Sequence, residues 1–395
     1  MNVESILASR TQNMKASAIR ELLKLAAQPG MISLGGGYPA PESFPLDMLD
    51  ELTLKVVQKY GAKALQYGPT EGFMPFREAL VTYMKKKGFN VSLDDILITS
   101  GSQGFLDAIG KIFISKGDCV AVEAPTYLGA IQAFNAYEPT YVCMETDEHG
   151  VLPESVEDVL KKHPIKFIYL VPTFQNPTGR TIPLDRRKAI ADIAQRHDAL
   201  IIEDDPYSEL RYRGDPVPPL KHLAPDHVVY ASTLSKVFAP GLRIGFCLAS
   251  ESVRKWLTLA KQGVDLHTSN YTQALAAEYV GGGYLERQIP IIVSIYKPKQ
   301  QAMLDALDKY FPDSFHWSKP EGGMFIWVEG PKGQDMAQIY LKAVERKVAF
   351  VPGKAFFTEE GDGIETIRLN YTNTDEASID KAIKILSEVI REEIG

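Results

Sequence analysis

The sequence has few cysteines, and their placement limits what they can do. Three occur in 395 residues, at Cys119, Cys143 and Cys247, so they are odd in number and far apart. Each lies in an apolar, strand-like run, which favours small core residues in a reducing compartment. We expect neither a disulfide framework nor a metal site.

Long apolar runs and an excess of basic residues are also missing. No run approaches the roughly 18 apolar residues of a membrane span, and the amino terminus lacks the apolar core and cleavage site of a signal peptide. The net charge is −7, and the longest basic run is Lys85, Lys86 and Lys87. Such a balance offers no surface for nucleic acid. We expect a cytoplasmic protein without membrane or nucleic-acid partners.

Short apolar runs alternate with helical patterns between Asp95 and Ser250. The seven runs are DILITSG, CVAVEAP, TYVCMET, FIYLVP, ALIIEDD, VVYAST and IGFCLAS. This alternation, in a chain that is 45% hydrophobic and 24% charged, predicts an α/β fold with a mainly parallel seven-stranded sheet between helices. Ligands of such sheets bind beyond the carboxyl ends of the strands, so the residues there are the candidates for a binding site.

The pattern changes after Lys255 to a long helical stretch that runs through about Lys309. It is interrupted at residues 281–283, which are glycines, and we expect it to bend or break near Pro290 and Pro298. Three strand-like runs follow, GGMFIWVE, VAFVPG and TIRLNYT, with a helical pattern between the first two. The last helix, 375–392, places Ile379, Ala382, Ile383 and Leu386 on one face. This region predicts a smaller α+β domain.

We therefore expect three parts. Residues 1–43 form an amino-terminal segment with a helical pattern up to Gln28, and they pack with the small domain and the active site. Residues 44–290 form the large domain, and residues 291–395 form the small one.

The segment STLSKVFAPGLRIG carries the most informative chemistry. It places Lys236 next to the hydroxyls of Thr233 and Ser235, with Arg243 seven residues further on. A lysine amine forms a Schiff base with an aldehyde, and hydroxyls with a guanidinium bind phosphate. The segment suits a phosphorylated aldehyde cofactor, although a solvated loop lysine is the more ordinary explanation when the segment is taken alone.

Two further strand ends carry polar residues that have both a functional and a structural explanation. In ITSGSQGFLD a helix opens near Ser102, so its free amides either bind an anion or form an ordinary capped turn. In VPTFQNPTG, Asn176 precedes a proline at a strand end, where it either points into a cleft or builds a turn.

Charged residues in two other strands suit the same cofactor. ALIIEDDPY ends in Glu203, Asp204 and Asp205, with Tyr207 three residues after Asp204. A carboxylate there can hold the proton of a pyridinium ring, or it can simply cap a helix. In TIRLNYT, Arg368 lies in an apolar strand and needs either an anionic ligand or an internal ion pair.

Taken together and in this order, the segments resemble the fold type I aminotransferases of class I/II, which use pyridoxal 5′-phosphate. The likeness is greatest to the aromatic, 2-aminoadipate and kynurenine aminotransferases. It covers essentially the whole chain, from MKASAIRELLKL through SLGGGYPAPESFP and QYGPTEG to IRLNYT. The resemblance implies a large cofactor-binding domain and a homodimer.

The resemblance also implies roles around the cofactor. Lys236 would carry the cofactor as a Schiff base and move the substrate proton, and Asp204 would keep the pyridine nitrogen protonated. Asn176 and Tyr207 would bind the phenolic oxygen; Lys236, Asp204 and Tyr207 would thus be the catalytic residues. The phosphate would contact Ser102, Gln103, Thr233, Ser235 and Arg243, while Tyr127 would stack on the ring and Tyr67 would reach the phosphate of the neighbouring subunit.

For the substrate, the resemblance implies that Arg368 binds the α-carboxylate, assisted by Asn176 and Gly37. Ser17 and Arg20 share a helix face that would close over the side chain. Arg20 either accepts a distal carboxylate or remains solvated. Tyr38 occupies a position where family members often carry leucine or phenylalanine, which bears on the side-chain preference.

The expected activity is transfer of an amino group between amino acids and 2-oxo acids by a ping-pong mechanism, with 2-oxoglutarate as acceptor. A C–S or related lyase on the same fold is the alternative. A regulatory ligand-binding module is a further alternative, but only about 30 residues precede SLGGGYP and they contain no basic recognition helix.

Overall fold

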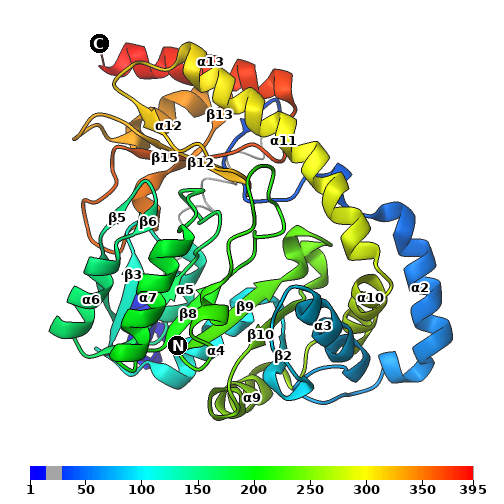
Figure 1. The fold of residues 1–395 in the computed structure, drawn as a ribbon. Coiled ribbons are helices and arrows are strands. Elements are labelled where there is room, and N and C mark those ends of the chain that lie inside the picture. The colour runs from blue at the N-terminus through cyan, green and yellow to red at the C-terminus, as the bar shows by residue number, and fades with distance from the viewer. Residues whose placement is uncertain (15–28, 395) are drawn as a thin grey trace.

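A seven-stranded sheet forms the centre of the larger part of the molecule (Figure 1). The structure is a computed structural model that describes residues 1–14 and 29–394. In spatial order the strands are β2 (Ile96–Thr99), β10 (Gly245–Leu248), β9 (Val228–Thr233), β8 (Ile201–Asp204), β7 (Ile165–Leu170), β3 (Cys119–Glu123) and β4 (Thr140–Met144). Only β10 runs antiparallel to its neighbours. These strands coincide with the seven predicted runs, so the predicted fold class is confirmed.

Both faces of this sheet are covered by helices, which explains why most residues of its strands are apolar on both sides. In β7, Phe167 and Tyr169 face a core shared with α4 (Gly101–Phe113) and α5 (Leu128–Asn135). Ile168 and Leu170 face the opposite core, which contains residues of α6 (Pro153–Lys162), α7 (Leu184–Arg196) and α8 (Leu220–Leu223). The period of two therefore sends neighbouring side chains to different layers.

The predicted helical stretch after Lys255 consists of three helices. They are α9 (Glu251–Asp265), α10 (Asn270–Gly281) and α11 (Tyr284–Tyr310), and α10 packs against α2 (Leu46–Tyr60) and α3 (Met74–Lys86). The predicted interruption at the glycines is confirmed. We predicted a bend or a break near the prolines, and the helix does not break there, because α11 continues through Pro290 and Pro298. Its face with Ile292, Tyr296 and Met303 is buried, and this packing outweighs the hydrogen bonds that the prolines remove.

A smaller antiparallel sheet lies near the carboxyl-terminal end of α11 (Figure 1). Its strands are β11 (His316–Trp317), β12 (Phe325–Glu329), β15 (Thr366–Asn370) and β14 (Val351–Pro352), and it is accompanied by α12 (Met336–Glu345) and α13 (Glu376–Ile394). Beside it, β1 (Ile32–Ser33) pairs in parallel with β13 (Val348–Ala349). The predicted face of the last helix, with Ile379, Ala382, Ile383 and Leu386, is fully buried.

The domain boundaries stay a prediction, and the one after residue 290 falls inside α11. Cys119, Cys143 and Cys247 are free thiols in β3, β4 and β10. Over residues 1–14 and 29–394, no helix is long and apolar enough to cross a membrane. In the same residues, no three His, Cys, Asp or Glu side chains are grouped to hold a metal ion.

Candidate active site

A cavity of about 560 Å³ lies where β8 and β9 end and α4 begins, and β12 and β15 contribute its other wall. The predicted site residues that line it are Gly37, Tyr38, Ser102, Gln103, Tyr127, Asn176, Asp204, Tyr207, Thr233, Ser235, Lys236, Arg243 and Arg368. These residues come from both sheets and from the segment after β1. The fold therefore gathers residues that are up to 331 positions apart in the sequence, from Gly37 to Arg368.

The three acids at the end of β8 have different partners. Oδ2 of Asp204 accepts a 2.9 Å hydrogen bond from the Tyr169 hydroxyl, and its buried Oδ1 has no partner among the described residues. The Glu203 carboxylate accepts the amides of residues 220 and 221 at the start of α8, 2.9 Å each. Asp205 accepts from the backbone of Ser208 and the hydroxyl of Tyr230. Only Asp204 lines the cavity.

The free oxygen of Asp204 is an acceptor without a donor. Burial raises the pKa of Asp204 to about 7, although the hydrogen bond from Tyr169 opposes the rise. A protonated ring nitrogen next to Oδ1 would both satisfy that oxygen and favour the ionised carboxylate. This position thus fits a cationic nitrogen ligand.

Lys236 ends the short 3₁₀ turn Leu234–Lys236 that follows β9. Its Nζ lies in the cavity and donates a 2.9 Å hydrogen bond to the carbonyl oxygen of Gly37. Burial, together with the guanidinium groups of Arg368 and Arg243, lowers the pKa of Lys236 to about 8. Because the neutral amine is the nucleophilic form, this shift prepares Lys236 to react with an aldehyde.

The start of α4 forms a cradle that only glycine permits. Gly101 has φ +72°, and a Cβ there would overlap the guanidinium of Arg243. A Cβ on Gly245 would lie 2.7 Å from the carbonyl carbon of Gly101, which is backbone and cannot move aside. The first amides of α4, at Ser102 and Gln103, border the same cavity. A helix start with this geometry fits a phosphate group.

Three further groups border the cradle. Oγ1 of Thr233 lies 2.9 Å from Oγ of Ser235. The exposed Arg243 has a left-handed backbone, with φ 54°. Among the described residues its guanidinium makes only long hydrogen bonds, of 3.3 and 3.4 Å, to the carbonyls of Pro240 and Ser100. Its donors therefore remain available for an anion.

Arg368 is buried in β15 on the opposite wall of the cavity. Its Nη2 donates to the Gly35 carbonyl at 2.6 Å and its Nη1 donates to Oδ1 of Asn176 at 3.0 Å. Nε has no partner, and no carboxylate pairs with this guanidinium in residues 1–14 and 29–394. Burial lowers the pKa of Arg368 to about 10, so the side chain stays cationic at neutral pH. The internal ion pair that the sequence left open is absent from the described residues.

Asn176 and Tyr207 lie together next to Arg368. Nδ2 of Asn176 is 3.4 Å from the Tyr207 hydroxyl, and both side chains are buried. Burial raises the pKa of Tyr207 above its ordinary value, so the hydroxyl keeps its proton and can donate a hydrogen bond. The pair offers two donors at one point of the cavity wall.

The profile of the class I and II aminotransferases matches residues 39–386. The chain belongs to this family. It is 46% identical to the aromatic-amino-acid aminotransferase 1 of Thermococcus litoralis, over 100% of this chain and 96% of that protein.

Two solved aminotransferases share this structure along its whole length. The kynurenine aminotransferase of Pyrococcus horikoshii, in complex with PMP, superposes with a TM-score of 0.96 and 45% identity, covering 100% of this chain and 99% of that one. The alpha-aminoadipate aminotransferase of Thermus thermophilus, complexed with N-(5′-phosphopyridoxyl)-L-leucine, superposes with a TM-score of 0.93 and 37% identity over the same shares.

This aminotransferase depends on pyridoxal 5′-phosphate, and the cavity fits that cofactor. The buried unpartnered oxygen of Asp204, the amine of Lys236 and the glycine cradle of α4 match a ring nitrogen, an aldehyde and a phosphate. The three groups differ in chemistry, so their occurrence in one cavity is a more specific signal than any of them alone.

Some residues of this aminotransferase site were not predicted from the sequence. Tyr169 holds Asp204, and Phe325 and Phe356 lie 4.4 and 5.0 Å from the Arg368 guanidinium, as ring centroids. The period of two in β7 and β8 places Tyr169 and Asp204 on the same face, so the alternation was the available signal.

One predicted residue that the structure describes, Tyr67, does not line the cavity. Its side chain is 79% exposed, with its ring 5.9 Å from that of His267. The predictions for Ser17 and Arg20 lie outside the described residues.

Proposed function

We propose that this aminotransferase moves the amino group of an aromatic or 2-aminoadipate-type amino acid to 2-oxoglutarate by a ping-pong mechanism. The observation that carries the proposal is the buried Arg368, a cation without a carboxylate partner among the described residues, in the cavity that also contains Lys236 and Asp204. The names of the similar enzymes supply the substrate class, since they include aromatic-amino-acid, kynurenine and alpha-aminoadipate aminotransferases.

Arg368 binds the α-carboxylate shared by all amino acid and 2-oxo acid substrates. A two-point contact with a planar guanidinium fixes the orientation of the carboxylate and hence of the bond between Cα and its hydrogen. Asn176 supports the fork through the 3.0 Å contact of its Oδ1 with Nη1. Gly37 lies beside Lys236 and contributes its backbone to the same end of the cavity.

When bound, pyridoxal phosphate supplies an aldehyde for the substrate amino group and a ring that accepts the electrons released when Cα loses its proton. Asp204 would hold a proton on the ring nitrogen through Oδ1. Tyr207 and Asn176 would donate to the phenolic oxygen, and Tyr127 would cover the ring. Lys236 would take the proton from Cα of the substrate and return it to the carbon that the aldehyde of the cofactor supplies, and a pKa near the operating pH suits this exchange.

The phosphate would be held at the start of α4 and by the residues around Lys236. The amides of Ser102 and Gln103 and the side chains of Thr233, Ser235 and Arg243, which border the cavity, would bind it. The large sheet would thus hold the cofactor, whereas Arg368 of the small sheet would hold the substrate carboxylate.

The cavity walls suit an aromatic side chain. Phe325, Phe356 and Tyr38 line the substrate end. The cations that line the cavity within the described residues are Lys236, Arg243 and Arg368, all of which already have roles. We therefore assign a distal carboxylate of glutamate or 2-aminoadipate to Arg20, which the sequence predicts to share a helix face with Ser17.

We also propose a cytoplasmic homodimer in which Tyr67 reaches the cofactor phosphate of the neighbouring subunit. The side chain of Tyr67 is 79% exposed in the single chain, and it borders the turn of His267. An exposed tyrosine at this place is available to a second copy. Sedimentation of the cofactor-loaded protein tests the dimer, and a monomer with full activity contradicts it.

The proposed reaction is tested by absorbance of the cofactor-loaded protein. Addition of an aromatic amino acid or 2-aminoadipate is expected to bleach the band of the aldehyde form, and 2-oxoglutarate is expected to restore it. A reversible cycle supports transamination and ranks the donors. Release of pyruvate and ammonia from cysteine conjugates without a reversible cycle indicates a lyase instead, and a band that no amino acid changes indicates a regulatory module.

The selectivity proposal is tested by Arg20→Ala. We expect the substitution to reduce kcat/KM for glutamate and 2-aminoadipate by about tenfold or more, with a smaller effect on aromatic donors, because it removes a charge-assisted contact to the distal carboxylate only. Equal losses for both classes contradict the role of Arg20.

A further inference from the structure

Residues 35–43 form the active-site segment, and their backbone touches two functional side chains. The Gly35 carbonyl accepts from Arg368 at 2.6 Å, and the Gly37 carbonyl accepts from Lys236 at 2.9 Å. Tyr38 lines the cavity with its side chain. Within this segment only residues 41–43 form regular structure, a single 3₁₀ turn. The position of these groups must therefore be fixed by contacts from other elements.

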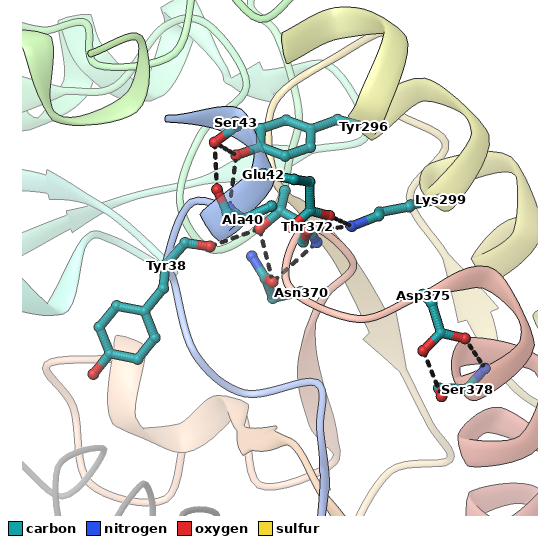
Figure 2. A network of polar contacts seen from close by, with 10 residues as sticks. All are labelled: Tyr38, Ala40, Glu42, Ser43, Tyr296, Lys299, Asn370, Thr372, Asp375 and Ser378. Atoms are coloured by element: carbon teal, nitrogen blue, oxygen red, sulfur yellow. Dashed lines mark hydrogen bonds and ion pairs between the residues drawn. The ribbon is translucent and has the colours of Figure 1, made fainter. Parts of the chain in front are cut away.

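The first set of contacts comes from the carboxyl end of β15, the strand that contains Arg368, and from Thr372 in the turn that follows it. Oγ1 of Thr372 lies 2.8 Å from the Tyr38 carbonyl and 3.0 Å from Oδ1 of Asn370 (Figure 2). The amide of Asn370 donates to the carbonyl of Leu34 at 2.7 Å. The strand that carries the substrate arginine, together with the turn after it, thus contacts the chain that borders the cavity.

The second set comes from α11. The hydroxyl of Tyr296 accepts from the Ala40 amide at 3.0 Å and donates to Oγ of Ser43 at 3.0 Å. Oγ of Ser43 in turn donates to the Ala40 carbonyl at 2.6 Å. All three residues are buried, so each unmade contact would leave a polar group without water.

Lys299 of α11 contacts both the segment and Thr372, so it connects the two sets of contacts. Its Nζ donates to Oε1 of Glu42 at 2.6 Å and to the Thr372 carbonyl at 3.0 Å (Figure 2). The Lys299 side chain is only 8% exposed, whereas that of Glu42 is 53% exposed. Burying an ammonium group is costly, and these two acceptors offset that cost only while the segment, the turn after β15 and α11 keep their relative positions.

The ring of Tyr38 points away from this network, as Figure 2 shows. The network therefore holds the backbone at Tyr38 while its side chain is free to border the substrate. A residue that borders a substrate needs a fixed main chain and a side chain that faces the cavity, and Tyr38 has both.

We propose that Lys299 is a positioning residue for substrate binding. Through Glu42 and Thr372 it locks the active-site segment, so that the Gly35 carbonyl orients Arg368 and Tyr38 borders the side-chain end of the substrate. The inference rests on the proposed function, because Arg368 is the carboxylate site there. Lys299 does not line the cavity and acts only through the segment.

The first test compares Lys299→Met with Lys297→Met in the cofactor-loaded enzyme. Lys297 is exposed on the same helix and serves as the matched control. We expect K299M to raise KM for the amino acid donor about tenfold with kcat within about twofold, because a misplaced Arg368 weakens binding of the substrate in both its ground and transition states. Lys299→Arg, which keeps a donor for both acceptors, is expected to recover most of the affinity.

A second variant covers the case in which K299M does not fold. Thr372→Val removes the hydroxyl at the Tyr38 carbonyl, whereas Thr372→Ser keeps it. We expect T372V to raise KM about fivefold and T372S to raise it less than about twofold. A role in stability alone would lower the melting temperature of both K299M and T372V and leave KM unchanged, and that result overturns the proposal.

Hydrogen exchange separates this inference from the proposed function. In the cofactor-loaded protein without substrate, amides of residues 35–43 are expected to exchange at least about fivefold faster in K299M than in the wild type or K297M. Unchanged exchange rates at residues 35–43 in K299M would contradict the proposal that Lys299 fixes this segment. If the wild type transfers no amino group, the proposed function fails, whereas the exchange result still decides whether Lys299 fixes the segment.

Discussion

The hydroxyl of Tyr169 donates a 2.9 Å hydrogen bond to Oδ2 of Asp204, and Oδ1 of the same carboxylate is buried with no partner in the part of the chain that the structure describes. One oxygen is thus committed to the protein and the other is left for the cofactor. The hydrogen bond also opposes the rise in the pKa of Asp204 that burial causes. Tyr169 therefore supports the ionised form that must hold a ring proton.

Replacing Tyr169 tests this support. Tyr169→Phe is expected to lower kcat about tenfold, because loss of a hydrogen bond to a charged group costs about 1.5–3 kcal/mol and raises the pKa of Asp204 further. Tyr141→Phe is a suitable control, since Tyr141 of β4 donates to Asn135 and lies away from the cavity. Steady-state kinetics at several pH values measure both variants, and an unchanged rate for Y169F contradicts the role of Tyr169.

Replacing Lys236 tests its two roles. Lys236→Ala is expected to abolish turnover but leave a protein that binds the cofactor without a covalent bond, since the cradle and Asp204 remain. Lys236→Arg keeps the charge but not a readily deprotonated amine, so it is expected to be equally inactive. Mass spectrometry after borohydride reduction measures covalent attachment. Transfer at a near-normal rate in either variant would show that the lysine is assigned wrongly.

The glycine cradle is tested by two alanine substitutions on one helix. Gly101→Ala is expected to weaken cofactor binding about tenfold or more, because the new Cβ displaces Arg243 and the backbone has φ +72°. Gly104→Ala meets its nearest neighbour, Cβ of Ser100, at 3.8 Å, so it is expected to leave cofactor binding unchanged and to stabilise the helix by about 0.5–1 kcal/mol. Fluorescence titration of the two apoenzymes with pyridoxal phosphate measures their affinities for the cofactor. Equal affinities of G101A and G104A would contradict the role of the glycine cradle.

Burial of Glu123 is expected to make the free energy of unfolding depend on pH. It is buried at the end of β3, accepts the Val171 amide at 3.0 Å, and its pKa is raised by burial to about 8 from an ordinary value of 4.5. The native state therefore holds a proton that the unfolded state releases, so this contribution is complete below pH 4.5 and is lost as the pH rises through about 8.

Glu123→Gln, a neutral isostere, removes this dependence. We expect similar stabilities for wild type and E123Q near pH 5, and an advantage for E123Q near pH 9 on the order of 2–4 kcal/mol. Urea unfolding of the apoenzyme at both pH values measures the difference. A constant difference across this range would show that Glu123 titrates normally.

Much of the site was predictable because its signals are local. Asp204 ends β8 and Arg368 lies within β15, whereas Lys236 follows the end of β9 by three residues and Asn176 follows the end of β7 by six. The strands themselves follow from short apolar runs. The resemblance to a family then assigned each of these residues a role toward the cofactor or the substrate. The described structure brings all four into one cavity.

Other features were not predictable because they depend on packing between distant segments. Helix propensity predicts a break at Pro290 and Pro298, yet α11 continues through both prolines. The lock made by Lys299 joins residues 257 and 73 positions away along the chain, at Glu42 and Thr372. No local pattern marks such a contact, and an isolated lysine on a helix ordinarily faces water.

The sequence by itself determined the strands, their layered burial and the types of residue that follow them, because alternation and apolar runs act over a few neighbouring residues. Tertiary structure alone decided which polar groups remain without protein partners. Glu203 and Asp205 are satisfied by α8, Ser208 and Tyr230, whereas Asp204 keeps one free oxygen and Arg368 faces carbonyl and amide oxygens instead of a carboxylate in the described part of the chain. The physical reason is that a buried group becomes a binding site only when the fold leaves it unpaired, and pairing depends on elements that meet only after the chain has folded.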